Sequence, residues 1–95
     1  MNFKRITSST SAVLTGRYRI MKVRIVAGTD AATAVLFDKL TYGSAGDAED
    51  FCKISAKAAN DNDKENFGND EGVQTSLGLS VLVTGTTPCV YIYFI

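Results

Sequence analysis

The chain of 95 residues contains no histidine and no tryptophan, and it has only one proline and two cysteines. Without histidine, it lacks the usual general base at neutral pH, the base of Ser–His and Cys–His nucleophile pairs, and the commonest zinc ligand. Two cysteines alone cannot complete a zinc site. The sequence also lacks the nucleotide-binding patterns G-x-x-x-x-G-K-[ST] and G-x-G-x-x-G. We therefore expect a protein that is not an enzyme and has no catalytic, cofactor-binding or metal-binding residues.

Long apolar runs are also missing, because no stretch approaches the ~20 residues that a membrane-spanning helix needs. The N-terminal sequence MNFKRITSSTSAV has basic residues but no apolar segment after them, unlike a secretory signal. We therefore expect a soluble protein made in a cytoplasm. Two cysteines in such a protein are usually small, unbridged side chains.

The first third of the chain contains no acidic residue. Residues 1–29 contain six basic residues and no acidic one, whereas the remainder contains four basic and ten acidic residues, so that the net charge is zero. This asymmetry predicts an electrostatic partner for one half, or head-to-tail contact between copies. The balanced total argues against a dedicated nucleic-acid-binding protein, which usually carries a basic domain.

What the chain does have is a series of short alternating runs separated by Gly, Thr, Asn and Asp clusters, which is typical of β-strands. We expect an all-β, single-domain antiparallel sandwich of about seven or eight strands, spanning residues 12–95 after an extended N-terminal arm, residues 1–11. The stretch 51–59 fits a helix or a strand, and we predict a strand because its surroundings are β. The expected strands are 17–26, 34–38, 51–59, 73–85 and 89–95, with turns at 27–33, where Gly28 is available for positive φ, and 60–72.

The longest run, RYRIMKVRI (17–25), alternates basic and apolar residues except where Ile20 and Met21 are adjacent. A β-bulge at this point would shift the register by one residue. Tyr18, Ile20 (or Met21), Val23 and Ile25 would then all face the core. The basic side chains would share the other face, where they meet either solvent or an acidic partner surface.

The C-terminal strand is apolar on both faces, with Val90, Ile92 and Phe94 on one and Tyr91, Tyr93 and Ile95 on the other. Because an ordinary two-layer sandwich buries one face of each strand, this pattern favours contact of the tyrosines with another subunit. The alternative is that loop 41–50 or the N-terminal arm covers them.

The acidic segment 60–72 has one pattern that suggests calcium. Asp61, Asp63 and Glu65 have the 1-3-5 spacing of calcium ligands, but Asn66 stands where a calcium loop has glycine, and Gly72 stands where it has its bidentate acid. We therefore expect a solvated turn.

Two longer segments, GRYRIMKVRIVAGTDAATAVLFD and TSLGLSVLVTGTTPCVYIYF, together resemble small virion structural proteins of tailed bacteriophages. The resemblance covers most of residues 12–94, and it implies a jelly-roll-like sandwich and a capsid decoration (cement) role without enzymatic activity. The acidic segment 60–72 and the arm 1–11 depart from the family pattern. The matching positions are Gly16, Tyr18, Ser76, Gly78, Leu79, Val81, Val83, Thr84 and Gly85.

Under this hypothesis the protein lies on the virion capsid surface, having been made in the host cytoplasm. Its partners are the major capsid protein and further copies of itself, with a trimer favoured over a dimer or monomer, and neither nucleic acid nor membrane is a partner. The alternative hypothesis is a receptor- or glycan-binding module of a phage fibre, knob or tail. The expected protein-contact residues are Phe3, Lys4, Arg5, Ile6, Arg17, Arg19, Lys22, Arg24, Tyr91 and Tyr93.

Overall fold

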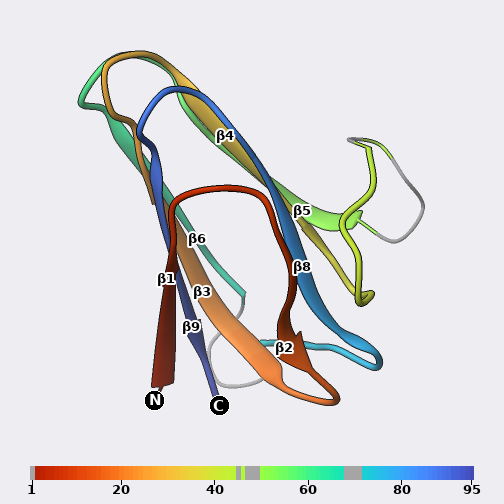
Figure 1. The fold of residues 1–95 in the computed structure, drawn as a ribbon. Coiled ribbons are helices and arrows are strands. Elements are labelled where there is room, and N and C mark those ends of the chain that lie inside the picture. Colours follow the sequence, from red (N-terminus) through yellow and green to blue (C-terminus); the bar gives the residue numbers. More distant parts are fainter. Residues whose placement is uncertain (1, 45, 47–49, 68–71) are drawn as a thin grey trace.

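The computed structural model describes residues 2–44, 46, 50–67 and 72–95. They form nine strands in two antiparallel sheets that pack face to face (Figure 1). None of the described residues belongs to a helix of the length and apolarity that crossing a membrane requires. The strands are β1 (Asn2–Ile6), β2 (Thr10–Thr15), β3 (Arg19–Val26), β4 (Ala32–Phe37), β5 (Asp50–Ala56), β6 (Asn62–Asn66), β7 (Val73–Gln74), β8 (Gly78–Thr84) and β9 (Cys89–Phe94).

The strand order is that of a jelly roll. Sheet A has the order β1-β9-β3-β6, with the short β7 also paired to β3, and sheet B has the order β2-β8-β4-β5. The pairs β1/β2, β9/β8, β3/β4 and β6/β5 therefore occupy matching places in the two sheets, as in a chain wound as two Greek keys. The predicted antiparallel sandwich is confirmed, with nine strands instead of seven or eight. Residues 2–6, predicted as part of an extended arm, form β1, which pairs along its length with β9.

The core lies between the two sheets and is built from the alternating apolar positions of their central strands. Val23 and Ile25 of β3 and Ile92 of β9 are fully buried from sheet A, and Leu36 and Val81 are fully buried from sheet B. Each of these side chains contributes about 1.5–3 kcal/mol through the area it removes from water.

The predicted β-bulge in β3 is confirmed at Met21. Ile20 pairs with Phe94 and Lys22 pairs with Tyr93, so two steps along β3 oppose one step along β9. The extra residue keeps both Ile20 and Val23 on the core side, where neither side chain is exposed. As a result, the basic residues on both sides of the bulge share the opposite face of sheet A.

Two segments differ from the sequence-based expectation. Within 60–72, predicted as a turn, Asn62–Asn66 form β6, which pairs along its length with β3. The strand expected over 73–85 is interrupted, because β7 ends at Gln74 and β8 begins at Gly78. The Asp38 carboxylate turns the chain there by accepting hydrogen bonds from the backbone N–H groups of residues 76–78. Leu77 therefore lies in the turn with 58% of its surface exposed, and not within the continuous strand expected over 73–85.

Position 28 needs a glycine because a larger residue would clash with its neighbours. The positive φ expected for Gly28 is not observed. Its φ lies outside the left-handed region, but a Cβ on it would lie 2.0 Å from Thr87 Oγ1 and 2.5 Å from the Thr86 carbonyl oxygen. The tight approach of the β3–β4 and β8–β9 turns therefore needs a residue without a side chain.

The outward-facing side chains of the two sheets differ in how deeply they are buried. Val35 and Phe37 of β4 point away from the core, yet they are 2% and 0% exposed. The chain after β4 packs against Phe37, with Lys39 Nζ 5.4 Å from the centre of the Phe37 ring and the Ser80 hydroxyl donating to the Lys39 carbonyl. On sheet A the corresponding tyrosines, Tyr91 and Tyr93, are only half-buried. Sheet A is therefore the sheet whose outer face is available for binding.

Candidate functional site

The outer face of sheet A gathers basic and aromatic side chains from four strands. Directly paired residues of antiparallel strands point to the same side, so each row of the register places its members together. One row consists of Phe3, Tyr93, Lys22 and Asn66, and the next consists of Arg5, Tyr91, Arg24 and Lys64. Arg19 joins the same face, since its backbone N–H and C=O are both bonded to Ile95. We call the surface made by Phe3, Arg5, Arg19, Lys22, Arg24, Lys64, Tyr91 and Tyr93 the cationic face.

In the first row, Tyr93 is held between two neighbours. The Phe3 ring lies 5.9 Å from the Tyr93 ring, centre to centre, and is tilted by 34°. From the other side, Lys22 Nζ lies 5.4 Å from the centre of the Tyr93 ring, a cation–π contact. Phe3 itself remains 59% exposed. The row therefore presents an apolar ring beside a positive charge.

In the second row, Arg5 is anchored but Arg24 and Lys64 are not. Arg5 Nε donates to Cys89 Sγ at 3.0 Å, and hydrogen bonding to Tyr91 and Cys89 raises the pKa of the guanidinium further. Within the described residues, the side chains of Arg24 and Lys64 form no hydrogen bond or ion pair. Both charges are therefore available to a partner.

Acidic side chains are segregated to the other side of β6. Asp63 and Glu65 pair with Ile25 and Val23, whose side chains face the core, so both carboxylates point toward sheet B. There the charge of Glu65 helps to raise the pKa of Cys52 on β5. Alternation along the edge strand β6 thus leaves Lys64, but neither acid, on the cationic face.

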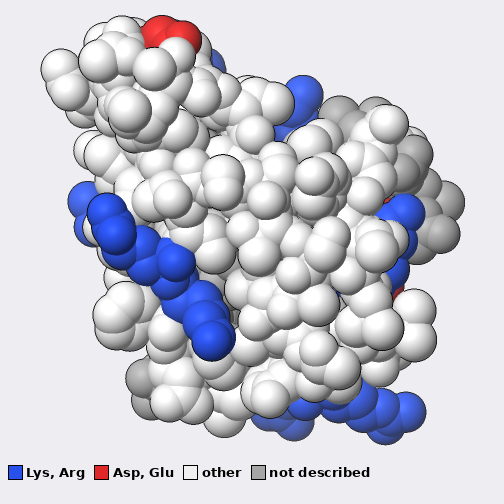
Figure 2. All heavy atoms as spheres, in the orientation of Figure 1, with Lys and Arg blue, Asp and Glu red and all other residues white. Residues whose placement is uncertain are grey.

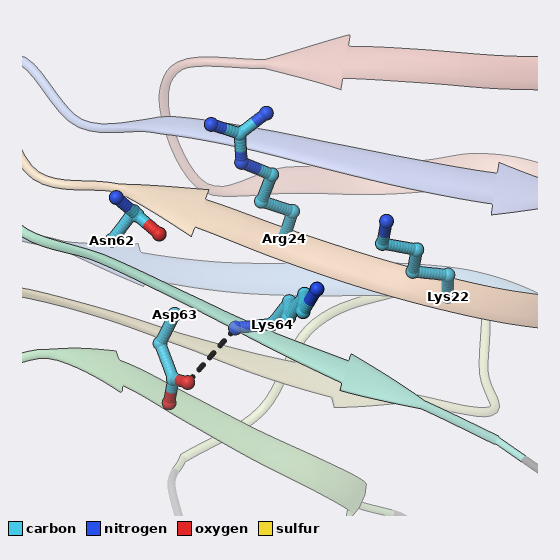
Figure 3. Close-up of a pocket in the computed structure, with 5 residues that line it drawn as sticks. All are labelled: Lys22, Arg24, Asn62, Asp63 and Lys64. Carbon is cyan, nitrogen blue, oxygen red and sulfur yellow. Dashed lines mark hydrogen bonds between the residues drawn. The ribbon is translucent and has the colours of Figure 1, made fainter.

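The charges are visible from outside. In Figure 2, one band of Lys and Arg side chains extends across the left of the view, where Figure 1 places the strands of sheet A, and further Lys and Arg side chains lie at the right and lower edges. The prominent acidic atoms lie at the top end of the molecule. An open groove of about 360 Å³ runs between β3 and β6, lined by Lys22, Arg24, Asn62, Asp63 and Lys64. In Figure 3, the Lys22, Arg24 and Asn62 side chains rise on one side of these strands, and the Asp63 carboxylate points to the other.

Comparison with known proteins finds no relative. Neither a protein family, a curated protein nor a solved structure matches this chain. The surface of the molecule itself is therefore the basis for inferring its function.

Most of the residues expected to contact a partner lie on one surface. Phe3, Arg5, Arg19, Lys22, Arg24, Tyr91 and Tyr93 all lie on the cationic face. Lys4 and Ile6 do not, because they pair with Ile92 and Val90 and so point toward the core side of the edge strand β1. Arg17 is exposed in the turn between β2 and β3, outside the paired rows.

Sequence reasoning missed Lys64 and Asn62. The composition of segment 60–72 predicts an acidic turn, in which side-chain directions are not defined. The alternation of Asn62, Asp63, Lys64, Glu65 and Asn66 was the available signal, since in a strand it separates the lysine from both acids.

The acids with calcium-ligand spacing do not form a ligand cluster among the described residues, in which no group of three or more His, Cys, Asp or Glu side chains converges. Asp61 caps the turn before β6, where its carboxylate accepts the N–H groups of Lys57 and Asn62. Asp63 accepts the N–H of Lys64 at 2.9 Å. Asp70 and Glu71, from the same segment, lie outside the described residues.

Proposed function

We propose that this protein is a non-enzymatic structural protein of a bacteriophage particle, a capsid decoration protein that binds an acidic surface of the major capsid protein through its cationic face. The observation that carries the proposal is the charge segregation on sheet A. Five cations, Arg5, Arg19, Lys22, Arg24 and Lys64, share one open face with Phe3, Tyr91 and Tyr93, and the acids of β6 point away from it.

The composition of this face suits a protein partner. Tyrosine, phenylalanine and arginine are the residues enriched where proteins bind one another. Because Lys22 and Phe3 contact the Tyr93 ring, its π surface is less available for stacking on a nucleic-acid base. Complementary charge would give fast, oriented association with an acidic shell.

The fold and the sequence resemblance both support a structural role on a phage capsid. Jelly rolls are common in viral capsid proteins, although lectins use the same fold and fold alone does not decide function. A decoration protein also binds a repeated surface, so that individually weak contacts gain strength when copies associate. We accordingly propose a homo-oligomer on the virion, with a trimer as the favoured state.

The direct test is cosedimentation of the purified protein with undecorated capsids assembled from the major capsid protein of the same phage. We expect saturable, stoichiometric binding that weakens as salt is raised. The double variant Arg19→Glu/Arg24→Glu should lose binding. Lys53→Glu, an exposed residue on β5 of sheet B, is the matched control and should bind normally.

Two results would overturn the proposal. One is the absence of capsid binding at micromolar concentration by the folded wild-type protein. The other is calcium-dependent binding on a glycan array, which would favour the receptor- or glycan-binding alternative. Sedimentation velocity of the free protein tests the trimer.

A further inference from the structure

The groove between β3 and β6 combines three cations with one amide. Lys22 and Arg24 contribute from β3, and Asn62 and Lys64 contribute from β6. Among the described residues one acid, Asp63, lines the groove, and its carboxylate points to the side of the strand opposite Lys22 and Arg24 (Figure 3). The groove is therefore positive, and nothing on its own wall neutralises it.

The pairing of β3 with β6 adds a second observation. Arg24 and Lys64 are direct cross-strand partners, and like charges placed directly opposite each other destabilise a sheet. Arg24 also pairs with Tyr91 on β9, which in turn pairs with Arg5, so no acid flanks it in its row. A bound anion would remove this repulsion, and none of the described side chains supplies one.

We propose that this groove is a binding site for a phosphate or sulfate group, a function that does not depend on attachment to a capsid. A guanidinium offers a planar pair of donors that matches two oxygens of such a group, and the two ammonium groups act as compact point charges beside it. The Asn62 amide adds a neutral donor. Three cations match a doubly charged oxyanion better than they match chloride or a single carboxylate.

Free oxyanions and the phosphates of a polynucleotide share this chemistry. The structure favours a single oxyanion, because Lys22 lies over the Tyr93 ring and the neighbouring Tyr91 is the direct cross-strand partner of Arg5. Strong single-strand binding uses aromatic rings that are open for base stacking.

The test is a titration of the isolated full-length protein with sodium phosphate, and separately with sodium chloride at matched ionic strength, followed by ¹⁵N amide shifts and by Tm. We expect saturable shifts confined to residues 22–24 and 62–64 and a phosphate-specific rise in Tm. Arg24→Gln and Lys64→Gln should each weaken phosphate binding about tenfold or more, which corresponds to the loss of one charge-assisted contact. Lys53→Gln, on the other sheet, should bind phosphate like the wild type.

Lys64→Gln provides a second readout, since removing one member of the like-charged pair should raise Tm slightly when phosphate is absent. Equal effects of chloride and phosphate, or wild-type phosphate binding by both groove variants, would overturn the proposal. Binding of a single-stranded oligonucleotide about 100-fold tighter than phosphate, with a steep dependence on salt, would also overturn it, because the groove would then be part of a nucleic-acid surface. Since no capsid enters this experiment, its failure and the failure of the decoration function are distinguishable.

Discussion

Lys22 and Tyr93 meet on the outer face of sheet A, with the lysine ammonium 5.4 Å from the centre of the tyrosine ring. They are direct partners in the β3–β9 ladder, immediately beside the Met21 bulge. The contact fixes the position of a positive charge on the face that we propose as the docking surface.

A double-mutant cycle on Lys22 and Tyr93 should therefore give a measurable coupling. With Lys22→Gln and Tyr93→Leu, we expect about 0.5–1 kcal/mol of favourable interaction, the range for a partly exposed cation–π pair. Urea denaturation of the four proteins measures it. A coupling energy of zero within error would mean that the lysine does not stabilise the ring.

Deletion of Met21 should be tolerated, whereas deletion of Val23 should not. Without Met21, Ile20 and Lys22 become adjacent and β3 alternates regularly, so every other side chain keeps its face. The cost is the loss of one buried side chain, about 1.5–3 kcal/mol. Deleting Val23 shifts the register and turns basic side chains toward the core. Circular dichroism during heating should show a cooperative transition for the first variant and none for the second, and equal loss of folding in both would contradict the bulge assignment.

Asp38 should be important for stability although it is not fully buried. Its carboxylate accepts hydrogen bonds from the N–H groups of Ser76, Leu77 and Gly78 at 2.9–3.4 Å. Asp38→Ala leaves these donors unpaired, and we expect a loss of about 2 kcal/mol in the free energy of unfolding. Asp38→Asn keeps one acceptor oxygen and should lose clearly less. If chemical denaturation ranks the two variants equally, the carboxylate does not hold this turn.

Cys52 should be an unreactive thiol at neutral pH. Burial, assisted by the charges of Glu65 and Asp50, raises the pKa of this thiol from 9.0 to about 11. The thiolate fraction at pH 8 is then about 100-fold lower than in an unperturbed cysteine, and alkylation by iodoacetamide should be slowed to match. Mass spectrometry of the alkylated peptides measures this rate against the unfolded protein. Similar rates in the two states would rule out the raised pKa.

The same shift affects stability at high pH. Because the folded state favours the neutral thiol, the contribution of Cys52 is fully present below pH 9 and is lost as the pH rises through about 11. Cys52→Ala should show a smaller loss of Tm than the wild type between these pH values. An unchanged pH profile would assign the alkaline loss to other groups.

Features that depend on local alternation could be predicted from the amino-acid sequence. Adjacent Ile20 and Met21 in an otherwise regular run predicted the bulge, and the two apolar sets of the last strand predicted that Tyr91 and Tyr93 face away from the core. Both predictions succeeded because side-chain direction in a strand follows from its period of two residues. The prediction for segment 60–72 was wrong, because its many charged residues indicated a turn, whereas the alternation of residues 62–66 is that of the strand β6.

Which of these side chains share a surface depends instead on how the strands are ordered in the folded domain. The strand order β1-β9-β3-β6 brings Arg5 from the beginning of the chain, Lys64 from its second half and Tyr91 from its end into the row of Arg24. On sheet B, Lys39 likewise packs against the outward-facing Phe37, which is buried. Pairing between distant strands arises from packing of the whole domain, and the local pattern of a single strand contains no information about its neighbours.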